Sequence, residues 1–324
     1  MRQADRVHFA TYNDEIEALF GVLRDCGIDP KRTSELNKDA YEAFALLYYH
    51  VFADERPADV SGVDLARANA GLGDIAAKIN KAVRSGHLGA IKPHLLEMVK
   101  GSPLMNRRSG GMADAADKTS ELYLGCLALN AGLSDVEIEH PVRSADGSNP
   151  DILLSSGSRP WAIAVKTMHG NSFPTMFQRI SEGAEQVERS GRDGFVLINL
   201  KNRMDNASLI DPSLVYESEQ SAVGIVTSVL KGMAEGVRNA IVDSDWSSLF
   251  RDARARPIIA LTGQSLVTVS VDEQKFWTPV RVIQVLRVPP APSSPEPLTG
   301  MDHEVVELLS KLNHELQWNP SHAQ

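Results

Sequence analysis

Two residues on consecutive short apolar segments carry side chains of the kind that act on phosphate esters. Asp151 begins the segment at 151–154 (DILL), and Lys166 lies near the end of the segment at 161–167 (WAIAVKT). A turn rich in serine and glycine separates them, and if the two strands form a hairpin, Asp151 and Lys166 can lie near one another. A carboxylate beside an ammonium group suits a Mg²⁺ site that acts on phosphate.

Glu121, near the start of a predicted helix, adds a second carboxylate that would pack beside these strands. In such a site the carboxylates hold the metal, which activates water and offsets charge on the phosphoryl oxygens. The lysine orients or helps to deprotonate the nucleophile, or stabilises the developing charge. The same residues also fit an exposed charged pair at the ends of two strands, so their spacing alone leaves both interpretations open.

The elements that must position these side chains follow from hydrophobic periodicity. Strand alternation places Trp161 and Val165 on one face of their segment, and Ala164 and Lys166 on the other. The predicted core consists, in order, of a helix at 121–132, strands at 136–142, 151–154 and 161–167, a helix at 173–191 and a strand at 194–200. Later segments predict a helix at 217–241 and strands at 256–263 and 279–288. This order indicates an α/β fold with a mixed sheet.

The rest of the chain predicts two flanking regions. Residues 1–105 form a helical N-terminal region, because no strand alternation interrupts their helical spacing. The α/β domain spans 106–288, and 289–324 is a proline-rich linker followed by an amphipathic helix. The connection at 101–121 is rich in small residues and is predicted to be a mobile loop or linker.

The element order and the site residues together resemble the PD-(D/E)xK nuclease superfamily, whose core is the restriction-endonuclease-like fold. The family motif is a helical Glu, then Pro-Asp on one strand and (Asp/Glu)-x-Lys on the next. Glu121, Pro150-Asp151 and the segment 164–166 (AVK) stand at these positions, and the resemblance covers about residues 118–200. It implies Mg²⁺-dependent hydrolysis of DNA, with Mn²⁺ as a substitute, in restriction or defence. Asp151 and Glu121 would then hold the metal, and Lys166 would assist the nucleophile.

Ala164 departs from the motif, because a methyl group stands where the family has a second metal-binding carboxylate. Three explanations are open. The first is that the alanine is a deliberate replacement of Glu or Asp. The second is that a carboxylate of the next helix, Glu182 or Glu185, binds the metal in place of the missing side chain, as in some similar restriction enzymes. The third is a nuclease fold that binds without cutting. Helical spacing places Glu182 nearly opposite the apolar face of its helix, which disfavours a role as a ligand.

The net charge of −9 excludes a basic field over the whole protein. DNA contacts are therefore expected at local clusters, namely Arg107 with Arg108, and Lys201 with Arg203. The negative net charge is also compatible with an alternative function, a protein-interaction module of a defence system that has no affinity for nucleic acid. By family analogy, a nuclease of this type would act as a homodimer whose two sites cut two strands.

The remaining composition points to an ordinary intracellular protein. The two cysteines give neither a disulfide framework nor the spacing of a zinc site. No apolar run reaches the roughly 18 residues that a membrane span needs. The first residues carry acids where a signal peptide has an apolar stretch. We expect a cytoplasmic protein without membrane association.

Overall fold

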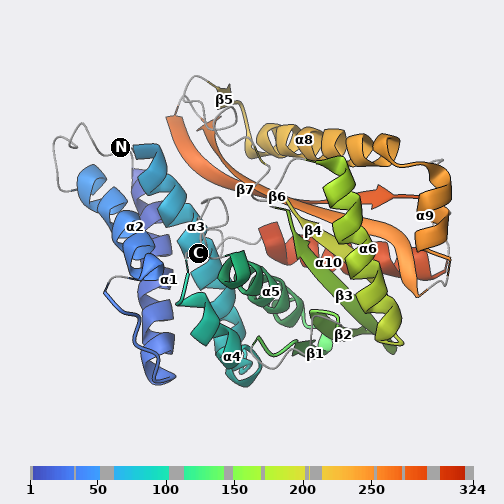
Figure 1. Ribbon diagram of the computed structural model, residues 1–324. Coiled ribbons are helices and arrows are strands. Elements are labelled where there is room, and N and C mark those ends of the chain that lie inside the picture. The colour runs from blue at the N-terminus through green and yellow to red at the C-terminus, as the bar shows by residue number, and fades with distance from the viewer. Residues whose placement is uncertain are drawn as a thin grey trace.

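The computed structural model in Figure 1 describes residues 3–32, 34–51, 62–101, 113–141, 149–168, 172–200, 204, 214–251, 254–271, 274–289 and 300–317. Among these residues, no helix is both long enough and apolar enough to cross a membrane.

Helices alone make up the described chain ahead of the first strand, as the sequence predicts. They are α1 (Gln3–Asp25), α2 (Glu35–Val51), α3 (Gly62–Arg84), α4 (Leu88–Met98) and α5 (Ala113–Asn130). The prediction of a loop through residue 121 is wrong from Ala113 onward. The alanines that follow Gly111 are strong helix formers, and they extend α5 by two turns toward the N-terminus.

A mixed seven-stranded sheet forms the centre of the molecule and confirms the predicted α/β class. Its strands are β1 (Ser134–Ile138), β2 (Ile152–Ser156), β3 (Arg159–Thr167), β4 (Asp193–Asn199), β5 (Val215–Tyr216), β6 (Ala255–Val271) and β7 (Gln274–Arg287). Strands β1, β2 and β3 form an antiparallel meander, and β4 lies parallel to β3. Both β4 and β5 pair in parallel with β6, which forms a long antiparallel hairpin with β7.

Helices cover both faces of this sheet (Figure 1). Those that follow the meander are α6 (Phe173–Arg189), α8 (Glu219–Ala240), α9 (Asp243–Leu249) and α10 (Met301–Gln317). Trp161 and Val165 of β3 point into a core shared with α5 and α10, whereas Ala162 and Ala164 point into a core shared with α6 and α8. The side chains of β3 therefore point to the two faces of the sheet that strand alternation predicts.

The N-terminal helices and the sheet share one hydrophobic core. Ile16 of α1 and Leu72 of α3 belong to the same buried cluster as Trp161 of β3 and Leu308 of α10. The proposed domain boundary at residues 105 and 106 falls outside the described residues. The continuous core means that the helical region packs directly on the α/β core.

Close approach of α6 to the sheet depends on Gly183. A Cβ atom at this position would lie 2.8 Å from Val196 Cγ1 and 3.3 Å from the Cβ atom of Ala164. The helix itself begins at Ser172, whose side chain accepts a hydrogen bond from the backbone N–H of Thr175. The N-cap at Ser172 fixes where α6 begins, and the lack of a side chain at Gly183 lets the helix pack closely against the middle of β3 and β4.

Candidate functional site

The β2–β3 hairpin brings Asp151 and Lys166 together, as the sequence predicts. A two-residue turn that contains Gly157 in the left-handed region (φ 63°) joins the strands, and Ile152 pairs with Ile163. One carboxylate oxygen of Asp151, Oδ2, accepts a hydrogen bond of 2.6 Å from the backbone N–H of Val165. The same oxygen lies 3.6 Å from Lys166 Nζ, so the two charges pair without a direct hydrogen bond.

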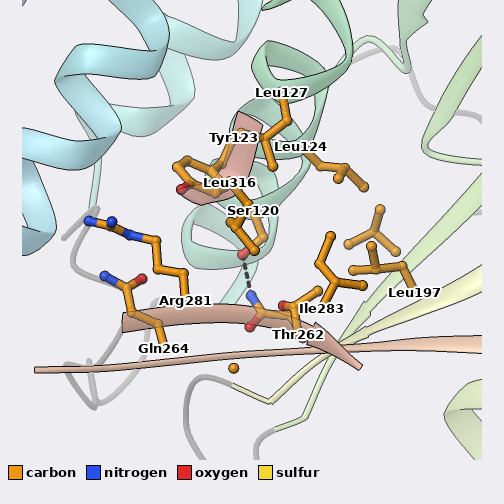
Figure 2. Close-up of a pocket in the computed structure, with 13 residues that line it drawn as sticks. Ser120, Tyr123, Leu124, Leu127, Leu197, Thr262, Gln264, Arg281, Ile283 and Leu316 are labelled. Atoms are coloured by element: carbon orange, nitrogen blue, oxygen red, sulfur yellow. Dashed lines mark hydrogen bonds between the residues drawn. The ribbon is translucent and has the colours of Figure 1, made fainter. Parts of the chain in front are cut away.

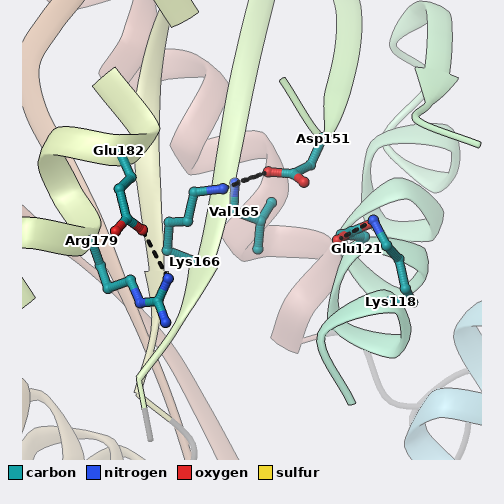
Figure 3. A network of polar contacts seen from close by, with 7 residues as sticks. All are labelled: Lys118, Glu121, Asp151, Val165, Lys166, Arg179 and Glu182. Atoms are coloured by element: carbon teal, nitrogen blue, oxygen red, sulfur yellow. Dashed lines mark hydrogen bonds and ion pairs between the residues drawn. The ribbon is translucent and has the colours of Figure 1, made fainter. Parts of the chain in front are cut away.

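Glu121 projects from α5 beside the hairpin, where its carboxylate contacts Lys118 (Figure 3). Glu121 and Asp151 are each only 4% exposed. Burial, followed by the negative charge of Asp151, raises the pKa of Glu121 to about 8, and the ammonium group of Lys118 offsets this only in part. A cation bound near both carboxylates would relieve their mutual repulsion.

Two charged residues that the sequence analysis did not single out belong to this cluster. Lys118, one turn before Glu121 on α5, donates to both of its carboxylate oxygens, at 2.9 and 2.8 Å. Glu139 follows β1, and its backbone N–H donates to the carbonyl oxygen of Asp151 at 2.8 Å. Burial, followed by the charge of Asp151, raises the pKa of the Glu139 carboxyl group. The sequence contained a signal for Lys118, because it lies three residues before Glu121 of a predicted helix. It contained none for Glu139, whose position depends on the pairing of β1 with β2.

His94 of α4 lies beside this cluster and is almost fully buried. Its Nε2 atom lies 2.9 Å from the carbonyl oxygen of Glu139, which requires Nε2 to carry the proton. Burial lowers the pKa of His94 to about 4, and the hydrogen bond offsets that effect only in part. The imidazole is therefore neutral near pH 7.

Ala164 is fully buried beneath α6 and offers no oxygen to a metal. Its methyl group belongs to the core between the sheet and α6, where it faces Gly183. A carboxylate at this position would have to displace the helix. The packing at position 164 is thus adapted to a small apolar side chain.

The two α6 carboxylates that the sequence nominates as substitute ligands are engaged on their own helix. Glu182 accepts hydrogen bonds from Gln178 at 3.0 Å and from Arg179 at 2.8 Å. Glu185 is 61% exposed and pairs with Arg189 at 2.9 Å. The structure brings Asp151 and Lys166 together, whereas Glu121 pairs with Lys118 and Glu182 pairs with residues of its own helix.

Mg²⁺ can be tested against the donor set that is present. Within the described ranges, no group of three or more His, Cys, Asp and Glu side chains is arranged to hold a metal ion. Mg²⁺ commonly takes only one or two carboxylates and keeps water and substrate oxygens as its other ligands. The two carboxylates of Glu121 and Asp151 match this open type of site in number. They do not fit a cation enclosed entirely by protein.

A small cavity lies between α5 and the sheet (Figure 2). Ser120 and Asn199, which are joined by a hydrogen bond of 2.9 Å, line it together with Val165 and Arg281. Its volume of about 30 Å³ suffices for one or two water molecules. The lining does not include Glu121, Asp151 or Lys166, so this cavity is separate from the charged cluster.

The predicted nucleic-acid contacts cannot be placed. Arg107, Arg108, Lys201 and Arg203 lie outside the described residues. They stay predictions from the sequence.

Comparison of the chain with protein-family models, with curated proteins and with solved structures finds no match.

Proposed function

We propose that this chain is a Mg²⁺-dependent nuclease that hydrolyses phosphodiester bonds of DNA in restriction or defence. The observation that carries the proposal is the pairing of Asp151 with Lys166, with the buried carboxylate of Glu121 near enough for its pKa to be raised by the charge of Asp151. Glu121 comes from α5, Asp151 precedes β2, and Lys166 comes from β3. Two carboxylates beside an ammonium group are a set suited to metal-assisted attack on a phosphate ester.

The arrangement of the core supports a restriction-endonuclease-like fold. Helix α5, the antiparallel meander of β1, β2 and β3, helix α6 and the parallel strand β4 follow one another in the order that the family resemblance implies. Asp151 lies at the start of the second strand of this meander and Lys166 near the end of the third. These are the positions of the two strand residues in the family motif.

Each of the three side chains has a separate task in this proposal. Glu121 and Asp151 would hold the Mg²⁺ ion, which when bound supplies an activated water and offsets charge on the phosphate. The backbone N–H of Val165 fixes one oxygen of Asp151, so that the carboxylate keeps its orientation. Lys166, half-buried beside Asp151, would hold the attacking water or stabilise charge that develops on the phosphate.

A second candidate function is a protein of the same fold that binds DNA without cutting it. The buried methyl group of Ala164 favours this alternative, because it removes one carboxylate from the family's usual set and α6 closes the space. This protein would show DNA affinity that falls with salt and no metal-dependent cleavage.

The test is a cleavage assay on plasmid and genomic DNA with Mg²⁺ or Mn²⁺, and with EDTA as the metal-free control. The unaltered protein is compared with Asp151→Asn and Lys166→Met, and with Glu185→Gln as the matched control. We expect cleavage by the unaltered protein and the control, and at least a hundredfold loss in the two site variants, roughly the contribution of a general acid or base.

Cleavage that survives Asp151→Asn would contradict the assignment of the site. Binding of DNA without cleavage in either metal would favour the second candidate. Neither cleavage nor binding would favour the interaction module of a defence system.

A further inference from the structure

The ammonium group of Lys118 already occupies one of the two carboxylates that the proposed function assigns to the metal. Its Nζ atom donates to both oxygens of Glu121, at 2.9 and 2.8 Å. The two side chains are 20% and 6% exposed. Because the pair is largely buried, salt screens it much less than a surface pair.

The position of Lys118 on α5 sets its distance from Glu121. Residues three apart on a helix lie on the same face, so the backbone holds the ammonium beside the carboxylate. Figure 3 shows Lys118 and Lys166 reaching the two carboxylates from different elements. Lys166 lies 3.6 Å from Asp151, whereas Lys118 contacts Glu121 directly.

The charges of the cluster nearly cancel while Lys118 is in place. With all three carboxyl groups ionised, those of Glu121, Asp151 and Glu139 outnumber the ammonium groups of Lys118 and Lys166 by one, which leaves one formal negative charge. Lys118 is attracted by all three carboxylates. Loss of its charge would leave two formal negative charges at the place proposed for a divalent cation.

We propose that Lys118 is a resident cation of this site, which competes with a divalent metal ion for the carboxylate of Glu121. This inference rests on the proposed function, because it takes Glu121 and Asp151 as the metal ligands. The metal ion binds only when the Lys118 ammonium leaves the oxygens of Glu121. The released ammonium is then available to a phosphate group, the chemical class that the proposed substrate carries.

The test is the affinity for Mn²⁺, measured by electron paramagnetic resonance of the free ion without DNA. Lys118→Met removes the charge, and Lys118→Gln is a second variant that can still hydrogen-bond Glu121. We expect both to bind Mn²⁺ about tenfold or more tightly than the unaltered protein, because a unit positive charge within a few ångströms is removed.

The controls separate charge from a general effect of substitution. Lys118→Arg keeps the charge, so it should not tighten Mn²⁺ binding. Lys100→Met breaks a pair of the same spacing with Glu97 of α4, and Lys100, which follows this helix, is 57% exposed. We expect this control to leave Mn²⁺ affinity unchanged.

The outcomes distinguish this inference from the proposed function. If both Lys118 variants bind Mn²⁺ no more tightly than the unaltered protein, while Asp151→Asn abolishes binding, the competition is overturned and the metal site stands. If no protein in the series binds Mn²⁺, the metal site and the competition are both overturned. Tighter binding in the two uncharged variants alone supports the inference.

Discussion

Buried charges, more than any pocket, set the properties of the proposed site at the scale of single residues. Asp151 is fixed by a backbone N–H and faces Lys166, while Glu121 is held by Lys118. Repulsion between the carboxylates contributes, after burial, to the raised pKa of Glu121. A ligand that neutralises both carboxylates therefore gains binding energy that a more exposed pair would not offer.

Position 164 should reject the carboxylate that the family motif has there. We expect Ala164→Glu to lower the free energy of unfolding by about 2–4 kcal/mol and to bring no gain in cleavage, because the side chain is overpacked and its charge is buried. The matched variant Ala164→Gln has nearly the same size as Ala164→Glu but no charge. We expect it to lose less unfolding free energy, and its loss measures the effect of overpacking without the buried charge. The measurement is urea unfolding. A stable and more active Ala164→Glu protein would mean that α6 can shift to admit a metal-binding carboxylate at position 164.

His94 should make the fold sensitive to acid. Its pKa is lowered from 6.5 to about 4 by burial, so the unfolded chain binds more protons than the folded chain between these values. Stability contributed by the neutral imidazole is complete above pH 6.5 and is lost as the pH falls toward 4, by up to about 3 kcal/mol. Urea unfolding at several pH values in this window should show a flatter profile for His94→Gln. Parallel profiles would contradict the prediction.

At the scale of elements, the antiparallel hairpin and the helix packed on it decide which side chains meet. The β2–β3 turn sets the register that places Asp151 beside the backbone of Val165. Helix α6 lies on the same side of the sheet as Ala164, and Gly183 sets how closely it approaches. The spacing between α6 and β3 is therefore part of the geometry of the site.

Gly183 should be intolerant of even a methyl group. We expect Gly183→Ala to cost about 1–3 kcal/mol of unfolding free energy, because its Cβ atom would lie 2.8 Å from Val196 and the helix must shift. Gly224→Ala on α8 is the control, since a Cβ atom there meets nothing within 4 Å. That variant should be neutral or up to about 1 kcal/mol more stable, from helix propensity. Equal effects in thermal unfolding would refute the packing argument.

The local part of this arrangement was predictable from the sequence. Alternation in the segment 161–167 gave the correct faces of β3, and the short turn gave the hairpin that joins Asp151 to Lys166. Contacts that join distant segments were not predictable. The pairing of Glu139 with Asp151 depends on strand register across a connection of more than ten residues. The start of α5 was missed because small residues favour loops and alanine-rich helices alike.

At the scale of the whole molecule, a buried polar network ties the N-terminal helices to the sheet. Arg281 of β7 pairs with Asp74 of α3 at 2.8 Å, and both side chains are almost fully buried. Tyr123 of α5 donates to the same carboxylate at 2.6 Å. Lys78 lies 3.8 Å from Asp74, and burial lowers the pKa of its ammonium group to about 8. Together with the shared hydrophobic core, these contacts join the helical region to the sheet that carries the site.

Arg281→Met should destabilise the entire protein. We expect a loss of about 3–5 kcal/mol in unfolding free energy, because the buried carboxylate of Asp74 loses its closest charged partner. The control is Arg189→Met on α6, whose exposed pair with Glu185 should contribute less than about 1 kcal/mol. Circular dichroism in urea should show one transition for the helices and the sheet, since they share one core. Separate transitions, or equal losses in the two variants, would contradict this account.

The most direct test of the metal site is anomalous X-ray scattering from crystals of the unaltered protein soaked in Mn²⁺. We predict one manganese peak within coordination distance of carboxylate oxygens from both Glu121 and Asp151, with Lys118 moved away from Glu121. Crystals of Asp151→Asn treated in the same way should lack this peak. A manganese peak elsewhere in the molecule, or none at this pair in the unaltered protein, would contradict the assignment of these carboxylates as a metal site.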